Sequence, residues 1–262
     1  MTLSLLLALG IVGILGGIAS GVLGFGGGVL LFPLLFYLPP LFGAGKLDAQ
    51  TIAAIVVVQV FFAALVGGAA HWRSGRVKPR LAIEAGLVSA LTAFIGSIAS
   101  TRVSEQFLLT LFGIVTMAIT GMLFLPGPTA EQERLPTSQV HVPKLPLAVF
   151  SSVAGLIVGF LGAGNFVFVP LLIYIFKVPT RVAIASSLVI ALLNTAAGFL
   201  GKLITGQVPL LAAALVVAGA SLGAVAGEWS HRRLSPALLR YIYASMVVVI
   251  TIRVWITLLG LG

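Results

Sequence analysis

The stretch GFGGGVLLFPLLFYL, residues 24 to 38, interrupts an apolar run with four glycines in five positions and then a proline. A second stretch, GFLGAGNFVFVPLLIYI at residues 159 to 175, has the same plan, with small residues from Gly162 to Asn165 followed by Pro170. Glycine and proline are the residues least compatible with a helix interior. The sequence therefore predicts a helix break at two corresponding places.

The composition around these breaks is that of a membrane protein. Of the residues, 60% are hydrophobic and 8% charged, and the mean hydropathy is +1.20, whereas about 25% of the residues of a soluble domain are charged. This predicts an all-α polytopic membrane protein. Stretches long enough to cross a hydrocarbon core of about 30 Å are residues 51–70, 81–101, 107–125, 182–201, 208–227 and 236–258.

Three simpler interpretations of the composition are set aside. The first apolar stretch, residues 3–23, lacks a basic leading region, so we expect it to be part of the fold and not a signal peptide. The absence of cysteine excludes disulfides and thiolate sites. The net charge of +9 is explained by basic residues beside membrane spans and does not indicate nucleic-acid binding.

The chain also contains an internal repeat. PLLFY at 33–37 returns as PLLIY at 170–174, and GGAAHWRSGRV at 67–77 returns as GFLGKLITGQV at 198–208. We predict two copies of one unit, each a glycine-broken helical hairpin plus three transmembrane helices. The first repeat is 1–125 with its hairpin at 3–38, a proline-rich cytoplasmic linker follows at 126–146, and the second repeat is 147–262 with its hairpin at 147–176.

The lysines and arginines of the loops test this topology. If each broken segment crossed the membrane once, they would divide seven to six between the two faces. If each segment is a hairpin, one face holds ten and the other three, which is the bias expected of a cytoplasmic face. The ten are Arg73, Arg76, Lys78, Arg80, Arg134, Lys144, Lys177, Arg181, Arg232 and Arg233, and the three are Lys46, Arg102 and Lys202.

This division predicts inverted repeats in the plasma (inner) membrane, with loops 71–80 and 126–146 cytoplasmic and both termini outside. Residues 147–160 would make only about 21 Å of helix, so we expect the hairpin to turn back inside the protein. A broken tip at membrane depth needs such a buried position or a cavity.

The tips are the predicted substrate site. A helix begins after each glycine turn, and its first N–H groups lack intrahelical partners and attract an anion. No acidic residue stands near the middle of a span, and the histidines are too scattered for a metal site. The candidate residues are Gly24, Phe25, Gly26, Gly27 and Gly28 in the first tip, Gly162, Ala163, Gly164 and Asn165 in the second, and Gln59, Ser186, Ser187 and Asn194 in the following helices.

Two alternatives concern the spans themselves. The polar side chains in the helices after the hairpins either line the cavity or form hydrogen bonds between helices. Gly219, Gly223 and Gly227 recur every four residues and predict close helix packing, either within the molecule or between protomers.

Together these features resemble the TauE/SafE family of sulfite exporters and sulfonate permeases. The resemblance is carried by the G-F-x-G hairpins that run into PLL-x-Y, by G-x-x-x-H ending at His71, by G-x-V at 75–77 and 206–208, and by the R-V-S and R-L-S turns. It implies a plasma-membrane carrier for sulfur oxyanions or organosulfonates such as sulfite, thiosulfate or sulfoacetate. One departure is Lys202, which stands where the first copy has His71.

We therefore predict a transporter that moves sulfur-containing anions by alternating access, with the substrate at the paired tips. The alternative is an anion channel or a facilitator of another small anion. Because no catalytic constellation is present, an enzyme is not expected, and neither is a cofactor. The expected partners are the small anion and the lipid bilayer, without nucleic acid, and a homodimer is a candidate assembly.

Overall fold

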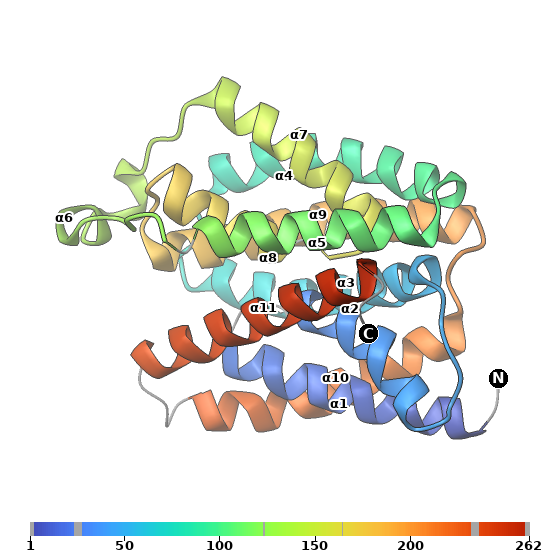
Figure 1. Cartoon of the computed structure of the whole chain (residues 1–262). Coiled ribbons are helices and arrows are strands. Elements are labelled where there is room, and N and C mark those ends of the chain that lie inside the picture. Colours follow the sequence, from blue (N-terminus) through green and yellow to red (C-terminus); the bar gives the residue numbers. More distant parts are fainter. Residues whose placement is uncertain (1–2, 24–27, 123, 164, 232–235, 260–262) are drawn as a thin grey trace.

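The computed structural model describes residues 3–23, 28–122, 124–163, 165–231 and 236–259. Within these ranges the side chains of residues 20–23, 165, 228–231, 236–244 and 246–247 are not described. The regular elements that the described residues form are all helices, which confirms the all-α prediction. Figure 1 shows them as a bundle, with α6 at one end and the start of α1 at the other.

The helices of the first half follow the predicted spans with small shifts. They are α1 (Leu3–Leu23), α2 (Gly28–Leu41), α3 (Ala49–Arg73), α4 (Pro79–Ala99), the 3-10 turn η1 (Ser100–Arg102) and α5 (Glu105–Met122). The linker contains two short helical turns, α6 (Ala130–Glu133) and η2 (Thr137–Gln139).

The second half begins inside the predicted linker. Its elements are α7 (Lys144–Leu161), α8 (Asn165–Pro170), the π-helical segment η3 (Leu171–Ile175), α9 (Thr180–Ile204), α10 (Leu210–His231) and α11 (Pro236–Leu258). Among the described residues six helices are long and apolar enough to cross a membrane, and α7 is one of them. At 18 residues it is about 27 Å long, so the expectation of a short first arm was wrong. The short arm of this hairpin is the one after the glycines.

The two long central helices end in the same way. After α3, Ser74 is followed by Gly75 with φ 68°, and after α9, Thr205 is followed by Gly206 with φ 70°. The glycine N–H donates to Trp72 O in the first turn and to Leu203 O in the second, both at 3.1 Å. This left-handed position after a helix favours glycine.

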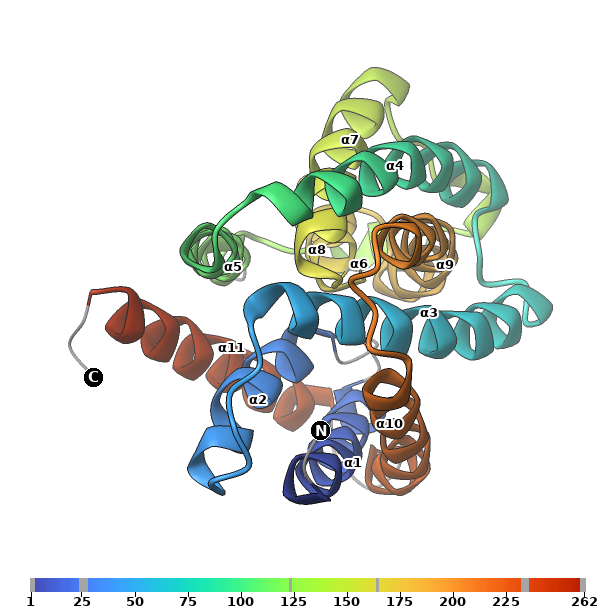
Figure 2. The same cartoon turned by 90° about the vertical axis from the view of Figure 1, so that its right-hand side faces the viewer.

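One helix of each half packs against a helix of the other half. α1 packs on α10, and α7 packs on α4 (Figure 2). Glycines let the backbones meet, since a Cβ added at Gly223 would lie 2.1 Å from Ile14 O and one at Gly159 would lie 2.3 Å from Ala93 O. The packing prediction for Gly219 and Gly223 is therefore confirmed, within one molecule. In both pairs the helices run in the same direction, because contacts advance together along them: Gly13 and Gly17 face Val216 and Ala220, and Gly155 and Gly159 face Ser89 and Ala93.

The centre of the bundle is the crossing of α3 and α9, which run in opposite directions. Gly68 near the end of α3 lies against Leu188 near the start of α9, and Gly198 lies against Val57. α9 runs parallel to α4, since Gly86 faces Leu193 and Gly201 faces Phe94. Because α7 is also parallel to α4, the chain between α7 and α9 has to return, so α7 and α8 with η3 form a hairpin.

The polar contacts of the loops gather at two ends. At the end with α6, Lys78 Nζ donates to Ser138 O at 2.7 Å, Lys177 Nζ donates to Pro126 O, and Thr180 N donates to the Glu133 carboxylate at 3.1 Å. At the other end, Lys46 pairs with Glu105 at 3.0 Å and Lys202 donates to Ser100. Among the described residues, these contacts join groups that the hairpin topology assigns to the same face.

Candidate functional site

The two broken segments meet at the start of α2. A Cβ added at Gly28 would lie 2.9 Å from Val60 Cγ2 and 3.2 Å from Ala163 Cβ. Gly28 of the first tip is therefore in contact both with the second tip and with α3. The other predicted residues of the first tip, Gly24, Phe25, Gly26 and Gly27, lie outside the described residues, as does Gly164.

The second tip lies against the backbone of α3. Gly162 ends α7 with φ 76°, and its N–H donates to Val158 O at 2.7 Å. A Cβ at this position would lie 2.0 Å from Ala53 O and 2.9 Å from Val57 N. Only glycine fits, because both the backbone angle and the distance exclude a side chain. Ala163 is fully buried, and Asn165 begins α8, although its side chain is outside the described part.

Two predicted polar residues near the tips are buried and have side-chain atoms without a partner among the described residues. Gln59 is 6% exposed and Asn194 is 0% exposed. Gln59 Oε1 and both side-chain polar atoms of Asn194 have no hydrogen-bond partner among the described residues. Buried polar atoms are almost always paired, and leaving one unpaired costs about 1–3 kcal/mol. Within the described part of the chain, these unpaired atoms are therefore available to bind water or a ligand.

The packing register brings both amides to the level of the tips. Gln59 lies in α3 between Val57, which the second tip contacts, and Val60, which Gly28 contacts. Asn194 lies one turn before Gly198, which packs on the same Val57. The structure therefore places both amides within about one helical turn of the level where the tips meet.

The two predicted serines lie elsewhere. Ser186 Oγ accepts the N–H of Lys78 at 3.0 Å, which ties the start of α9 to the start of α4. Ser187 Oγ donates to Ile184 O at 2.9 Å within its own helix. Both are about 10 to 12 Å from Asn194 along α9 at 1.5 Å per residue, toward the linker end. The Ser186 hydrogen bond matches the alternative of bonds between helices, the Ser187 bond is internal to α9, and the structure does not bring either serine to the tips.

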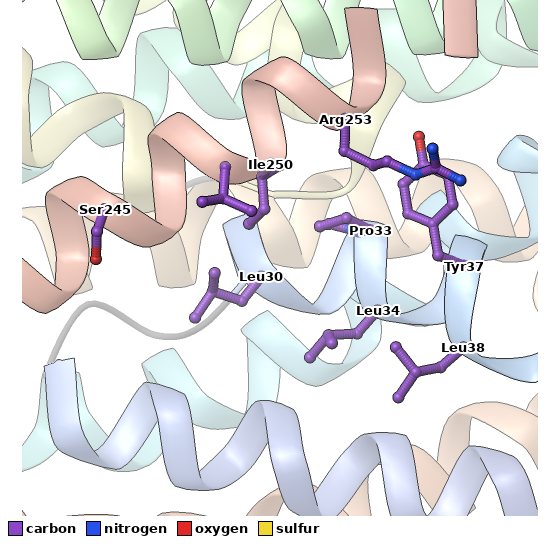
Figure 3. Close-up of a pocket in the computed structure, with 9 residues that line it drawn as sticks. Leu30, Pro33, Leu34, Tyr37, Leu38, Ser245, Ile250 and Arg253 are labelled. Atoms are coloured by element: carbon purple, nitrogen blue, oxygen red, sulfur yellow. The ribbon is translucent and has the colours of Figure 1, made fainter. Parts of the chain in front are cut away.

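One cavity lies on another side of the first hairpin, between α2 and α11 (Figure 3), with a volume of about 330 Å³. Tyr37 stands at one end, donating to or accepting from Thr257 Oγ1 at 3.0 Å, with Arg253 5.4 Å from its ring centre. The lining is otherwise mostly apolar, so it does not suit a small hydrated anion. It consists of Leu30, Pro33, Leu34, Tyr37, Leu38, Ser245, Val249, Ile250 and Arg253.

Ser151 and Lys202 are among the buried polar positions that sequence reasoning missed. Ser151 in α7 is fully buried and its hydroxyl has no partner among the described residues. Lys202 is fully buried near the end of α9, although a lysine so close to a helix end is usually expected to reach solvent. The mismatch between Lys202 and His71 in the repeat was the only available signal. No group of metal-binding side chains occurs among the residues that the structure describes.

The chain has long apolar helices, crossed packing between its two halves, and broken segments that meet beside buried amides. These are the features of a multi-pass membrane transporter. The family model described as "Sulfite exporter TauE/SafE" matches residues 9–254, and the chain belongs to this family. It therefore works in a lipid bilayer on a small-molecule substrate.

Relatives with similar sequences bear matching descriptions. A "Probable membrane transporter protein" from Xylella fastidiosa (strain Temecula1) is 36% identical over 190 residues, which are 71% of this chain and 69% of the relative. The "Probable membrane transporter protein YunE" from Bacillus subtilis is 24% identical over 239 residues, covering 86% of this chain and 88% of the relative. No solved structure matches the chain significantly.

Proposed function

We propose that this protein carries sulfur-containing anions such as sulfite, thiosulfate or organosulfonates across the plasma membrane, with the substrate bound where the hairpin tips meet. The observation that carries the proposal is the contact of Gly28 with Ala163 at the level of Asn194, whose buried amide has no hydrogen-bond partner among the described residues. Amide N–H groups and the free backbone N–H groups at the start of α2 are donors suited to an oxyanion. Such a site binds an anion without a charged ligand at the tips.

The arrangement of helices supports alternating access between inverted repeats. The crossed pairs, α1 with α10 and α4 with α7, exchange places when the two halves are exchanged, and α3 and α9 run in opposite directions. These relations are those of two halves related by an axis in the membrane plane. Rocking one half against the other would open the tips to each face in turn.

The charge contacts at the two ends support an orientation. The end with the linker gathers Lys78, Lys144 and Lys177 in contact with neighbouring loops or helices, and we assign it to the cytoplasm. At an inside-negative potential, each exported negative charge gains about 2.3 kcal/mol per 100 mV. We therefore assign the direction as export, which needs no coupling ion.

Flux into proteoliposomes tests the function. Purified protein is reconstituted and assayed with sulfite, thiosulfate, sulfate, sulfoacetate and taurine. We expect saturable flux of one or more sulfur anions, stimulated by the same anion on the far side, and none of the zwitterion taurine. Flux that stays linear with concentration would favour the channel, and absence of flux for the whole panel would overturn the proposal.

Substitution of the buried amides tests the site. Asn194→Ala removes both unpaired atoms and should weaken anion binding by about 1–3 kcal/mol. Ser151→Ala is the matched control, because it removes another buried polar atom without a partner, about 16 Å from the second tip along α7. Unchanged affinity in Asn194→Ala, in protein that still transports, would move the site away from the tips.

A further inference from the structure

Lys202 is the one charged side chain that is fully buried among the described residues. Its Nζ donates to Ser100 Oγ at 2.9 Å and to Gln207 Oε1 at 3.3 Å. Ser100 belongs to η1 at the end of α4, and Gln207 to the loop before α10. The ammonium thus lies where η1, the end of α9 and the loop before α10 meet, at the end away from the linker.

Both partners of Lys202 are neutral. The Gln207 amide is held with its oxygen toward the lysine, because its Nε2 donates to Ser97 O at 3.0 Å and to Thr205 Oγ1 at 2.6 Å. Ser100 Oγ lies 2.6 Å from Ser97 O and 2.8 Å from Gln207 Oε1, so its proton is also engaged. With neutral acceptors the ammonium has no carboxylate hydrogen-bonded to it, and an uncompensated buried charge is costly in a low-dielectric interior.

No described carboxylate forms a salt bridge with Lys202. The described carboxylates have other positions: Glu105 pairs with Lys46, Glu84 with Arg80, and Glu133 with Thr180, while Asp48 caps α3 and Glu131 is exposed in the linker. Glu228 follows Leu210 by 18 residues in α10, about 27 Å along the helix toward the other end. An anion from outside the chain would supply the counter-charge that the described residues do not.

The position of Lys202 on α9 connects it with the tips. Asn194, Gly198 and Lys202 are spaced four residues apart and lie on one face of the helix. Gly198 packs on Val57, which the second tip also contacts. Lys202 is therefore about 12 Å from Asn194 along the helix at 1.5 Å per residue, on the side of the tips that faces away from the linker.

We propose that Lys202, with Ser100 and Gln207, forms a second anion site, through which the transported oxyanion passes between the hairpin tips and the membrane face away from the linker. The anion supplies the counter-charge that the described residues do not, and the lysine is a substrate ligand in transit. This inference rests on the proposed transport of anions and adds to it a charged ligand, a position and a face.

A charge series at this site tests the inference, with thiosulfate and sulfite as probes in the proteoliposome assay. Lys202→Met removes the charge, and Gln207→Glu keeps the shape while giving the lysine a built-in carboxylate partner. Each should raise the concentration of anion needed for half-maximal flux at least about tenfold, as expected for a lost hydrogen bond to a charged group. Lys202→Arg keeps the charge and should stay within about threefold of the wild type.

The matched control is Lys46→Met, which removes an exposed cation from the same end of the molecule and should leave the flux unchanged. If Lys202→Met fails to fold, Gln207→Glu still decides in protein that melts with the wild type, since unchanged melting shows that loss of the Nε2 donations to Ser97 O and Thr205 Oγ1 is tolerated. Wild-type flux with unaltered half-saturation in Gln207→Glu would overturn this site and leave the proposed function standing. Wild-type protein that moves no sulfur anion of the whole panel would overturn both.

Discussion

The end of α3 and the end of α9 share a backbone turn and differ in the side chains around it. In both, the helix closes on a left-handed glycine whose N–H donates back to a carbonyl at 3.1 Å. Beside the first turn His71 is half-buried with Nδ1 unpaired among the described residues, and Arg76 is exposed. At the matching places of the second half, Lys202 is buried and Gln207 is its acceptor.

The glycines are common to both copies of the repeat, whereas the charged side chains differ between them. Glycine is required at both turns and at both crossed helix pairs, where an added Cβ would strike a backbone atom or strain the chain. The charged positions are free to differ, and they make the two ends of the bundle unequal: exposed cations surround the linker, and a buried one lies at the other end. Substitutions at the shared glycines should therefore affect the two halves alike, and substitutions at the charged positions should affect them differently.

The largest effect is expected in the crossed pairs. Gly159→Ala at the α4–α7 contact and Gly223→Ala at the α1–α10 contact should each lower the free energy of unfolding by about 2–3 kcal/mol, since a methyl group would overlap a backbone oxygen. Melting of the purified protein in detergent measures the loss. Gly121→Ala in α5, where a Cβ meets nothing within 4 Å, is the control. If either variant melted at the same temperature as the wild type, the two helix contacts would not be equivalent.

A smaller and equal loss is expected at the two turns. Gly75→Ala and Gly206→Ala meet no neighbour within 4 Å, so only the left-handed backbone opposes the methyl group, at about 1–2 kcal/mol each. The same melting experiment compares them directly. If the two variants lost different amounts of unfolding free energy, the two turns would share their backbone angles but not their energetics.

The difference between the halves predicts opposite behaviour of the two basic residues. Lys202→Met should raise the free energy of unfolding by about 1 kcal/mol, because an uncompensated buried charge is replaced by an apolar side chain of similar volume. His71→Leu, at the half-buried position, should change it by less than about 0.5 kcal/mol. A stability loss in Lys202→Met would mean that its two hydrogen bonds outweigh the cost of burying the charge.

The smallest effect on stability is expected from single cysteines placed at the two ends of the bundle for labelling. Single cysteines at Ser74, Ser138 and Thr101, all exposed, should leave the stability unchanged in this cysteine-free chain. A membrane-impermeant thiol reagent should label Thr101→Cys on intact cells, and the other two only after the membrane is opened. The reverse labelling pattern would mean that the linker end faces the outside and that the assigned orientation is wrong.

Some features that sequence reasoning got right are local. The helix breaks fall beside Gly28 and Gly162 because glycine acts on its own backbone. The start of α7 at Lys144 was missed because Pro146 was taken as linker. Proline fits the first turn of a helix, where its missing N–H would have had no partner.

Other features depend on the partner that a segment finds. The stripe Gly219–Gly223 indicated close packing, but nothing in it named α1 as the partner. Ser186 and Asn194 look alike in the sequence as buried polar residues of one helix. Only the fold gives the first a partner in Lys78 and leaves the second without one among the described residues.

The sequence by itself determined that this protein is a helical membrane transporter with two broken segments, because hydropathy, helix-breaking residues and loop charges act along the chain. The tertiary structure alone decided which polar atoms remain unpaired and which charge is buried. Pairing and burial are properties of every neighbour at once, and for Asn194 and Lys202 those neighbours come from segments far apart in the chain.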